Sequence, residues 1–506
     1  MKGLYLNVPD AEAAVSRFDR LIGVETAVAR GKHPAFPRVV IGYHPEAWPQ
    51  GPVVDEPEIF AAASGWFVFR GRVGDLRGFA LAFSEARVRG EETRVLSEIA
   101  AGAYVILLGL GQDGFIVSDP FGLHPHYFAD EPFSQIAPSP HFLKEDRPPV
   151  PEHAAILEAE NHLFGNLTLY RGVERLEPGA IITRRSVHRW FRYESERGAV
   201  SGVRDALAAG VALFRGTTSI LPLSGGLDSR LIAASGAFDY AYTFGPPTTG
   251  DRPVARHFAG RFREYKEFSL LEIPYPIAVR EIASECLDGV CLRPFLELVP
   301  VYQFLYRAWG GGFFFDGYLG DVLQRGTYLT HSGFRGSLAK LMPSLTLNGF
   351  DPLALLRRRH PALSAESFAL VADLYRKTMG EMDLDDLHKV LLFEIIYGRG
   401  ARYTTNGGTI LSGQFWTPIH PFFFPQVFRL LFGQSLEDAL FYRTMRRVWS
   451  SVSRSDAAVP TYSGFSPLWN EHRARATMLV VKGIGRTGLY RRAISYESEL
   501  PRVHWR

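Results

Sequence analysis

The stretch ILPLSGGLDSRLIAAS, residues 220–235, decides the fold of the second half of the chain. It begins as an apolar run, passes through two adjacent glycines and continues with residues typical of a helix. Adjacent glycines are unfavourable in the interior of a strand or a helix. We therefore expect a turn here, joining a buried strand that ends at Leu223 to a helix that starts near Asp228.

This turn has the features that a phosphate group requires. The amino terminus of a helix leaves backbone N–H groups unpaired and carries partial positive charge, so it binds anions. Gly225 and Gly226 allow the backbone to approach an anion closely, and Ser224 and Ser229 add hydroxyl donors. Asp228 would repel a phosphate, so we expect Mg²⁺ between the two.

A plainer reading of residues 224–229 is a tight turn in which Ser or Asp caps a helix. The complete string, placed directly after a strand, favours nucleotide binding over that reading. The turn is not a Walker-type loop, because no Gly-Lys-Ser/Thr sequence follows it.

The residues around this turn alternate between helix-like and strand-like runs. We expect helices over 201–214 and 229–235 and around 253–262, and strands over 219–224, 240–245 and 264–270. Such alternation predicts a parallel sheet with helical crossovers, the α/β class. From Val279 onward helical patterns dominate, which predicts a helical extension of this domain.

The first half has a different pattern. Short strand-like runs cover 65–73, 77–83, 103–110, 114–119 and 176–185. Two helix-like stretches interrupt them, near 93–101 and 152–164, and the combination predicts a layered α+β domain. The polar, aperiodic segment 190–202 is interpreted as a linker, giving domains 1–195 and 196–506.

Composition narrows the class of protein. The 506 residues are 46% hydrophobic and 22% charged, as in an ordinary globular protein of two domains. The formal charge of +3 gives no reason to expect nucleic acid as a partner. No apolar run suits a signal peptide or a membrane helix, and two cysteines are too few for a disulfide framework, so we expect a cytoplasmic protein. A homodimer or a complex with a partner protein stays open.

The turn also resembles a known family. Residues 224–229 look like the pyrophosphate loop of the N-type ATP pyrophosphatases. The longer string LPLSGGLDSR, residues 221–230, is most similar to the asparagine synthetase superfamily, which includes β-lactam synthetases and lasso-peptide cyclases. The resemblance implies an enzyme that uses Mg²⁺ and ATP to adenylate a carboxylate, releases pyrophosphate, and lets an amine attack the acyl-adenylate.

The resemblance implies an ATP site built from several segments. The turn itself would contribute Leu223, Ser224, Gly225, Gly226, Asp228 and Ser229. Residues 243–262 are similar to the family's second strand, whose end contacts adenine, which implies Phe244 and Gly245. Residues 313–326, FFFDGYLGDVLQRG, resemble its second glycine-rich acidic loop. That loop implies Gly317 and Tyr318 beside the nucleotide and Asp321 as a second Mg²⁺ ligand with Asp228, although DGYLGD alone is typical of a Gly-Asp turn.

The resemblance also implies catalytic residues. In β-lactam synthetases a tyrosine at the place of Tyr318 serves, with a glutamate, as the base for the attacking amine, and Glu394 is the nearest acidic partner along the chain. The alternative is a tyrosine that only packs beside the loop. Family members carry a lysine near the carboxyl end. The matching candidate is Lys482, whose sequence context departs from the family motif, and Arg486 is the substitute.

The first half resembles the class II glutamine amidotransferase domain, over residues 113–128 and 164–179. This implies an Ntn-hydrolase-like arrangement of α/β/β/α layers. Those glutaminases use an N-terminal cysteine, whereas this chain has Lys2, and an ammonium is a poor substitute for a thiolate. Cys286 and Cys291 lie in the second half of the sequence, so we expect an inactive domain that does not hydrolyse glutamine.

Three functions follow from these patterns. The first is an AMP-forming ligase or cyclase that joins a small-molecule or peptide carboxylate to an amine without glutamine. The second is a glutamine- or ammonia-dependent amidotransferase acting on an amino acid or a carboxylated sugar. The third is a catalytically inactive homologue that acts as a binding module. The sequence names neither the carboxylate nor the amine.

Overall fold

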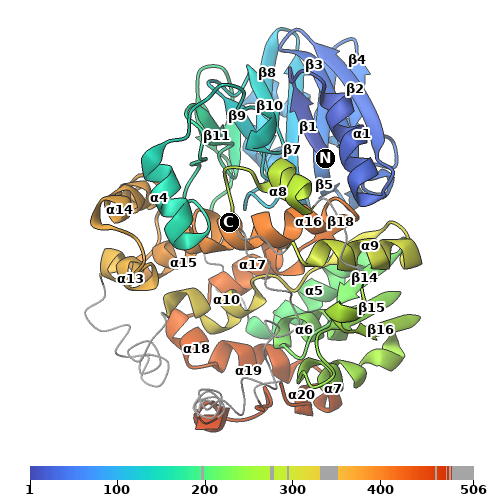
Figure 1. The fold of residues 1–506 in the computed structure, drawn as a ribbon, viewed down its shortest axis with the longest axis vertical. Helices are drawn as coiled ribbons and strands as arrows, with labels where there is room; N and C mark the ends of the chain where they lie inside the picture. The colour runs from blue at the N-terminus through green and yellow to red at the C-terminus, as the bar shows by residue number, and fades with distance from the viewer. Residues whose placement is uncertain are drawn as a thin grey trace.

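The computed structural model describes residues 1–194, 199–273, 279–292, 296–330, 351–461 and 464–474, together with 476, 477 and 480. The first half forms two antiparallel sheets and the second half forms one parallel sheet. In Figure 1 the antiparallel sheets occupy the upper part and the parallel sheet the lower part, and the helices of residues 386–432 lie between them. The mixed α/β character predicted from the sequence is confirmed.

The first antiparallel sheet has the strand order β11-β9-β10-β1-β3-β2. Its strands are β1 (Gly3–Leu6), β2 (Ala27–His33), β3 (Phe36–Tyr43), β9 (Tyr127–Ala129), β10 (Gln135–Ala137) and β11 (Val173–Arg175). Alternate residues of β1 face opposite sides of this sheet, as the pleat of a strand requires. Leu4 and Leu6 belong to one buried cluster, and Tyr5 belongs to another.

The second antiparallel sheet has the order β13-β12-β8-β7-β5-β4, with β6 paired to β5. Its strands are β4 (Val53–Glu56), β5 (Ile59–Phe69), β6 (Arg72–Val73), β7 (Ile99–Leu110), β8 (Asp113–Ser118), β12 (Ala180–Ile182) and β13 (Val187–Arg189). The two sheets pack face to face, since Leu4 and Leu6 share a buried cluster with Phe60 and Leu107.

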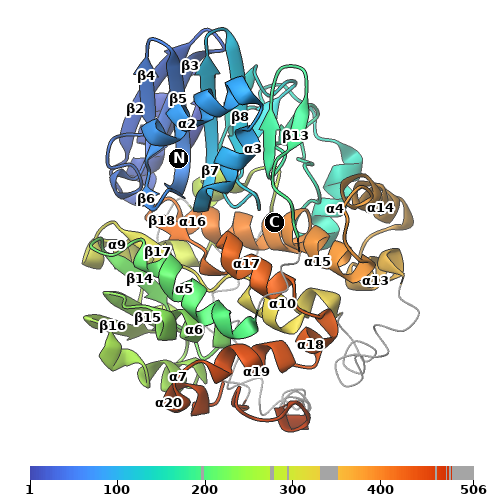
Figure 2. The same ribbon diagram turned by 180° about the vertical axis from the view of Figure 1, so that it is seen from behind.

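Helices cover the outer faces of both sheets. The helices of the first half are α1 (Ala11–Ile22), α2 (Leu76–Arg89), α3 (Glu92–Ser97) and α4 (Pro151–Glu160). The apolar face of α1 packs on the first sheet, where Val15 and Phe18 share a cluster with Val40. Figure 2 shows α2 and α3 on the outer face of the second sheet. The first half is therefore layered α/β/β/α.

One predicted strand is a helix. Residues 77–83 were expected to be extended, but they lie within α2. Asp75 caps this helix by accepting a hydrogen bond from the backbone N–H of Gly78, and Phe79 and Phe83 are buried one turn apart. Their spacing of four residues matches one face of a helix, and this periodicity prevailed over the local alternation.

The second half contains a parallel sheet with the order β16-β15-β14-β17-β18. Its strands are β14 (Ser219–Pro222), β15 (Tyr240–Phe244), β16 (Glu264–Phe268), β17 (Phe313–Phe315) and β18 (Thr417–Ile419). The alternating pattern predicted the first three. The short strands β17 and β18 lie within the region that we expected to be helical, and three residues are too few for a sequence pattern to reveal.

Helices account for most of the remaining residues. Around the first three strands lie α5 (Val203–Ala212), α6 (Leu227–Ser235), α7 (Asp251–Arg256) and α9 (Leu298–Trp309), whereas α8 (Val279–Leu287) packs against the first half beside residues 140–142. Later helices are α10 (Gly320–Arg325), α13 (Pro352–Arg359), α14 (Ala365–Met379), α15 (Asp386–Ile396), α16 (Ile410–Ser412), α17 (Pro425–Phe432), α18 (Leu436–Leu440), α19 (Arg443–Ser450) and α20 (Arg454–Ala458). A π-helix, Gly400–Thr409, joins α15 to α16, and no helix among the described residues is long and apolar enough to cross a membrane.

The two halves are extensively joined. Arg175 of β11 donates hydrogen bonds to the carbonyl oxygens of Ile396 at 3.0 Å and Gly122 at 2.9 Å. One continuous buried cluster contains residues of both halves, for example Phe121 and Phe428, whose rings lie 4.6 Å apart. The predicted boundary between residues 195 and 196 lies outside the described residues and stays a prediction.

Candidate nucleotide site

A cavity of about 320 Å³ opens at the carboxyl ends of β14, β15 and β17. Ligands of open parallel sheets bind at this edge of the sheet, and small-molecule sites measure roughly 300–1,000 Å³. Of the residues predicted to bind nucleotide, this cavity is lined by Leu223, Ser224, Gly226, Asp228, Ser229, Phe244, Gly317 and Tyr318. The predicted residues Gly225, Gly245 and Asp321 lie beside it rather than on its wall.

The glycine-rich turn is held in shape by its own hydroxyl groups. The backbone N–H of Ser224 donates to Oγ of Ser229 at 3.1 Å, and the N–H of Gly226 donates to Oγ of Ser224 at 3.2 Å. The N–H of Gly225 donates to Oδ1 of Asp251 at 2.7 Å. Because α6 starts at Leu227, the turn directs a helix amino terminus toward the cavity.

The structure brings the two predicted metal ligands together. Gln324 donates from Nε2 to Oδ1 of Asp228 at 3.0 Å, and the backbone of Asp321 also hydrogen-bonds to that carboxylate. Burial raises the pKa of Asp228 to about 7; Arg325 opposes this shift, and the charge of Asp321 adds to it. A divalent cation would relieve this repulsion between the two carboxylates.

Two glycines allow the acidic loop to approach the turn this closely. A Cβ on Gly317 would lie 2.9 Å from the backbone nitrogen of Ser229. A Cβ on Gly320 would lie 2.7 Å from Cγ of Asp228. Real Cβ atoms do not approach other atoms so closely, so both positions require glycine for the loops to pack as they do.

The donor set fits Mg²⁺. This ion is usually held by one or two carboxylates together with substrate phosphates and water. Asp228 and Asp321 supply two carboxylates, whereas no group of three or more His, Cys, Asp or Glu side chains suited to a metal occurs in the described part of the chain. The remaining ligands would therefore come from the nucleotide and from water.

The end of β15 forms the far side of the cavity. Thr243 and Phe244 line it, and Gly245 follows with φ +136°, a conformation that favours glycine. The carbonyl oxygen of Gly245 accepts a hydrogen bond from Arg252 at 2.5 Å. A flat aromatic ring at this place offers a stacking surface for a base.

Tyr318 lines the cavity next to Gly317. Its ring packs edge-on against His420, with ring centroids 6.0 Å apart. Its buried hydroxyl makes no well-formed hydrogen bond to any described residue. Burial, with smaller contributions from Tyr328 and Asp316, raises the pKa of this phenol well above its usual value.

The carboxylate of Glu394 is bound by residues other than Tyr318. Oε1 accepts from Nε of Arg359 at 2.6 Å and lies 2.8 Å from Nε2 of His360, and Oε2 accepts from the backbone N–H of Arg399 at 3.1 Å. Burial alone would raise the pKa of Glu394, but the charges of Arg359 and His360 lower it below its usual range. The predicted Tyr318–Glu394 pair is not hydrogen-bonded in this structure. Lys482 and Arg486 lie outside the described residues.

Two carboxylates of this site were not predicted from the sequence. Asp251 holds the turn through Gly225, and Asp316 lines the cavity directly after β17. Asp316 directly follows the apolar run of β17, which places an acid at the carboxyl edge of the sheet, whereas Asp251 begins α7, seven residues after β15 ends. That signal was present in FFFD, residues 313–316, but the strand was too short to be predicted.

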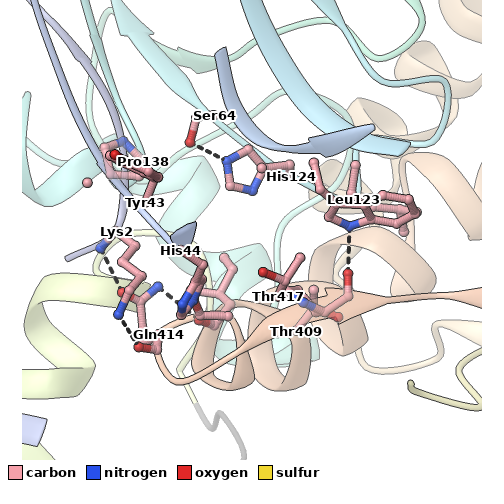
Figure 3. Close-up of a pocket in the computed structure, with 18 of the residues that line it drawn as sticks. Lys2, Tyr43, His44, Ser64, Leu123, His124, Pro138, Thr409, Gln414 and Thr417 are labelled. Carbon is pink, nitrogen blue, oxygen red and sulfur yellow. Dashed lines mark hydrogen bonds between the residues drawn. The ribbon is translucent and has the colours of Figure 1, made fainter. Parts of the chain in front are cut away.

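A second, smaller cavity of about 60 Å³ lies where the two halves meet (Figure 3). Lys2, His44, Ser64 and His124 line it together with Gln414. Oγ of Ser64 lies 2.8 Å from Nε2 of His124, and Figure 3 shows Lys2 directed toward Gln414, away from that pair.

Both cysteines belong to the second half of the sequence, as expected, yet Cys286 and Cys291 share a buried cluster with Met1 and Tyr5 of the first half. The helix α8 carries Cys286 to this place. Burial raises the pKa of its thiol, which disfavours the nucleophilic thiolate, and Cys286 does not line the cavity beside Lys2.

Comparisons with known proteins add little to this geometry. No family model matches the chain, and no curated protein matches it. A solved structure of the allosteric regulatory enzyme of purine biosynthesis is 12% identical, over 53% of this chain and 78% of its own, with a TM-score of 0.21. The glutamine phosphoribosylpyrophosphate amidotransferase from B. subtilis, complexed with ADP and GMP, is 11% identical over 53% and 79%, with a TM-score of 0.20. TM-scores this low carry no argument, so the proposal below depends on the site itself.

Proposed function

We propose that this protein is an ATP-dependent ligase that forms an amide bond and releases AMP and pyrophosphate. The observation that carries the proposal is the meeting of Asp228 and Asp321 beside a glycine-rich turn at the carboxyl edge of a parallel sheet. The resemblance of residues 221–230 to the asparagine synthetase superfamily supports the same reaction. The α/β/β/α layers of the first half are compatible with the Ntn-hydrolase-like domain that this resemblance implies.

The residues of the cavity suggest how ATP would lie. Phe244 offers a stacking surface for adenine at the end of β15. The α6 amino terminus, with Ser224 and Ser229, would donate hydrogen bonds to the phosphates. Asp228 and Asp321 would hold Mg²⁺, which when bound neutralises charge on the phosphates.

The proposed reaction has two steps. An oxygen of the substrate carboxylate attacks the α-phosphorus of ATP, and pyrophosphate leaves. The nitrogen of an amine then attacks the acyl carbon, and AMP leaves with the electron pair of the broken C–O bond. The turn and the acidic loop would act in the first step, and residues at the Tyr318 end of the cavity would act in the second.

Glutamine is not the expected source of nitrogen. Lys2 occupies the place at which the glutaminases that the first half resembles carry their nucleophilic cysteine. Its ammonium donates a hydrogen bond to the backbone carbonyl of Gln414. The adjoining cavity of about 60 Å³ is much smaller than usual small-molecule sites. The nitrogen would therefore come from a substrate amine or from free ammonia.

Nucleotide binding tests the proposal without knowledge of the carboxylate. Wild type should bind ATP with Mg²⁺ in isothermal titration, and Asp228→Asn and Asp321→Asn should each weaken binding at least tenfold without unfolding. Asp113→Asn, exposed at the start of β8, is the control. Wild type should also release pyrophosphate with at least one member of a panel of amino acids, peptides and uronic acids. If both aspartate variants bind ATP like wild type, the metal assignment is wrong.

A further inference from the structure

Asp316 is the first residue after β17, and its carboxylate lines the nucleotide cavity. Its backbone N–H donates to the carbonyl oxygen of Ile419 in β18 at 2.9 Å, which fixes its position. Its side chain makes no hydrogen bond or ion pair with any residue that the structure describes. A carboxylate held in such a place without a partner requires an explanation.

The surroundings of Asp316 are aromatic. Tyr242 of β15 and Tyr318 line the same cavity, and the charge of Asp316 contributes to the raised pKa values of Tyr242, Tyr302 and Tyr318. The other titratable groups that line this cavity are Asp228 and Asp251. Burial raises the pKa of Asp316 to about 6, and no cation among the described residues offsets this effect. A cationic ligand would offset the effect of burial and lower the pKa of Asp316.

The strand order places Asp316 opposite the predicted adenine side. The three strands lie side by side in the sheet in the order β15-β14-β17. Phe244 ends β15, the phosphate-binding turn follows β14, and Asp316 follows β17. A nucleotide stacked on Phe244 with its phosphates at the turn would leave Asp316 on the far side of the phosphates. That is the side from which a second substrate can approach.

The chemistry around Asp316 suits an organic ammonium. A divalent metal ion requires several oxygen ligands, whereas an ammonium is bound well by one carboxylate beside aromatic faces. Carboxylate and phenol rings come together here in Asp316, Tyr242 and Tyr318. This set differs from the Asp228–Asp321 pair, which lies against the phosphate-binding turn.

We propose that Asp316 binds the ammonium group of the substrate amine and accepts the proton that the amine must lose before it attacks. This inference rests on the proposed ligase function. The carboxylate takes one N–H proton, the freed nitrogen lone pair forms the bond to the acyl carbon, and the C–O bond to AMP breaks with its electron pair on the phosphate oxygen. The second proton passes from the new amide nitrogen to water.

Asp316 is better placed for this step than the groups predicted from the sequence. The Glu394 carboxylate is already bound by Arg359 and His360. The Tyr318 phenol is held protonated by burial. The Asp316 carboxylate is not bound by any described residue, and a base is required because alkylamines are almost wholly protonated at neutral pH.

Binding of a simple ammonium tests the site directly. Ethylammonium is titrated into wild type and into Asp316→Asn, each with Mg²⁺ and the non-hydrolysable analogue AMPCPP. We expect Asp316→Asn to bind AMPCPP within about twofold of wild type and to lose at least tenfold in ethylammonium affinity. Asp113→Asn is the matched control, and circular dichroism checks the fold. Equal ethylammonium affinity, or joint loss of AMPCPP binding, overturns the inference.

Measurements of turnover distinguish whether Asp316 acts as a base or only binds the ammonium group. Hydroxylamine is largely uncharged at neutral pH and needs no base, whereas ethylamine does. With a carboxylate that supports pyrophosphate release, Asp316→Asn should lose roughly 10²–10⁴-fold in amide formation from ethylamine and only a few-fold from hydroxylamine. Equal losses with both nucleophiles overturn the role as base. Wild type that binds ethylammonium but no nucleotide would overturn the ligase function and support Asp316 as an ammonium site.

Discussion

Lys2 is joined to Gln414 by two hydrogen bonds: its backbone N–H donates to Oε1 at 2.8 Å, and its Nζ donates to the carbonyl oxygen at 2.6 Å. Burial lowers the pKa of the Lys2 ammonium to about 8, and the nearby charges of Asp19 and Glu46 oppose that shift. Lys2 therefore connects the amino terminus of the first half to the segment between α16 and β18.

Replacing Lys2 should weaken this junction. Lys2→Ala keeps the backbone hydrogen bond but leaves the Gln414 carbonyl without its Nζ donor, and an unsatisfied buried acceptor costs about 1–3 kcal/mol. We expect the free energy of unfolding in urea to fall by that amount. The exposed Lys32→Ala is the control. Equal stability of the two variants would show that the Nζ hydrogen bond contributes nothing.

Glutamine should not be hydrolysed. The cavity of about 60 Å³ beside Lys2 is too small for glutamine, and the thiol of Cys286 is buried away from its wall with a raised pKa. Incubation of wild type with glutamine and ATP should yield no glutamate above a protein-free blank, and Lys2→Ala should behave alike. Glutamate production abolished by Ser64→Ala would instead reveal the Ser64–His124 pair as a nucleophile.

Gly317→Ala should disrupt the nucleotide site. The added Cβ would lie 2.9 Å from the backbone nitrogen of Ser229, so the acidic loop and the turn must move apart. We expect at least a tenfold loss of ATP affinity and a destabilisation of about 1–3 kcal/mol. Gly260→Ala is the control, because a Cβ there meets nothing within 4 Å. If both variants bind ATP equally, the close approach of the loops is not needed.

The ion pairs of His360 predict a pH dependence of stability. His360 lies between Glu160 and Glu394, with 2.8 Å from a ring nitrogen to each carboxylate. Burial alone would lower its pKa, but the charge of Glu394 and the hydrogen bonds to both glutamates raise it to about 9.

Because the folded-state pKa of His360 exceeds the unfolded value of 6.5, its stabilisation is complete below pH 6.5 and is lost as pH rises through 9. The stability difference between wild type and His360→Gln should shrink by on the order of 2–3 kcal/mol between pH 6 and 9.5. Chemical denaturation at each pH measures it. The exposed His188→Gln should show no such trend, and a difference independent of pH would contradict an ionised His360.

Tyr318→Phe distinguishes two candidate bases. The phenol of Tyr318 has a raised pKa and no well-formed hydrogen bond, so we expect its loss to slow amide formation less than tenfold. Exchange of labelled pyrophosphate into ATP should remain within about twofold of wild type. A loss of 10²-fold or more in amide formation alone would favour Tyr318 over Asp316 as the base.

Much of the fold followed from local pattern. The apolar run at 220–223, the glycines after it and the helix-forming residues beyond them predicted β14, the turn and α6, because each signal acts over a few residues. In the first half the apolar runs predicted most of β7, β8 and β12 and part of β5, whereas the strands of the first sheet were not predicted and residues 77–83 were wrongly predicted as a strand. Their burial one helical turn apart against the second sheet decided the helix α2.

The sequence by itself determined the strand-turn-helix that presents Ser224 and Asp228, since backbone geometry there depends on neighbouring residues. Only the tertiary structure decided which distant side chains meet. Gln324 reaches Asp228 from 96 positions away, Glu394 is bound by Arg359 and His360 rather than by Tyr318, and the carboxylate of Asp316 lines the cavity with no hydrogen bond or ion pair to a described residue. Such partnerships depend on how helices and strands pack against one another, and packing is a property of the whole chain that no short window of sequence contains.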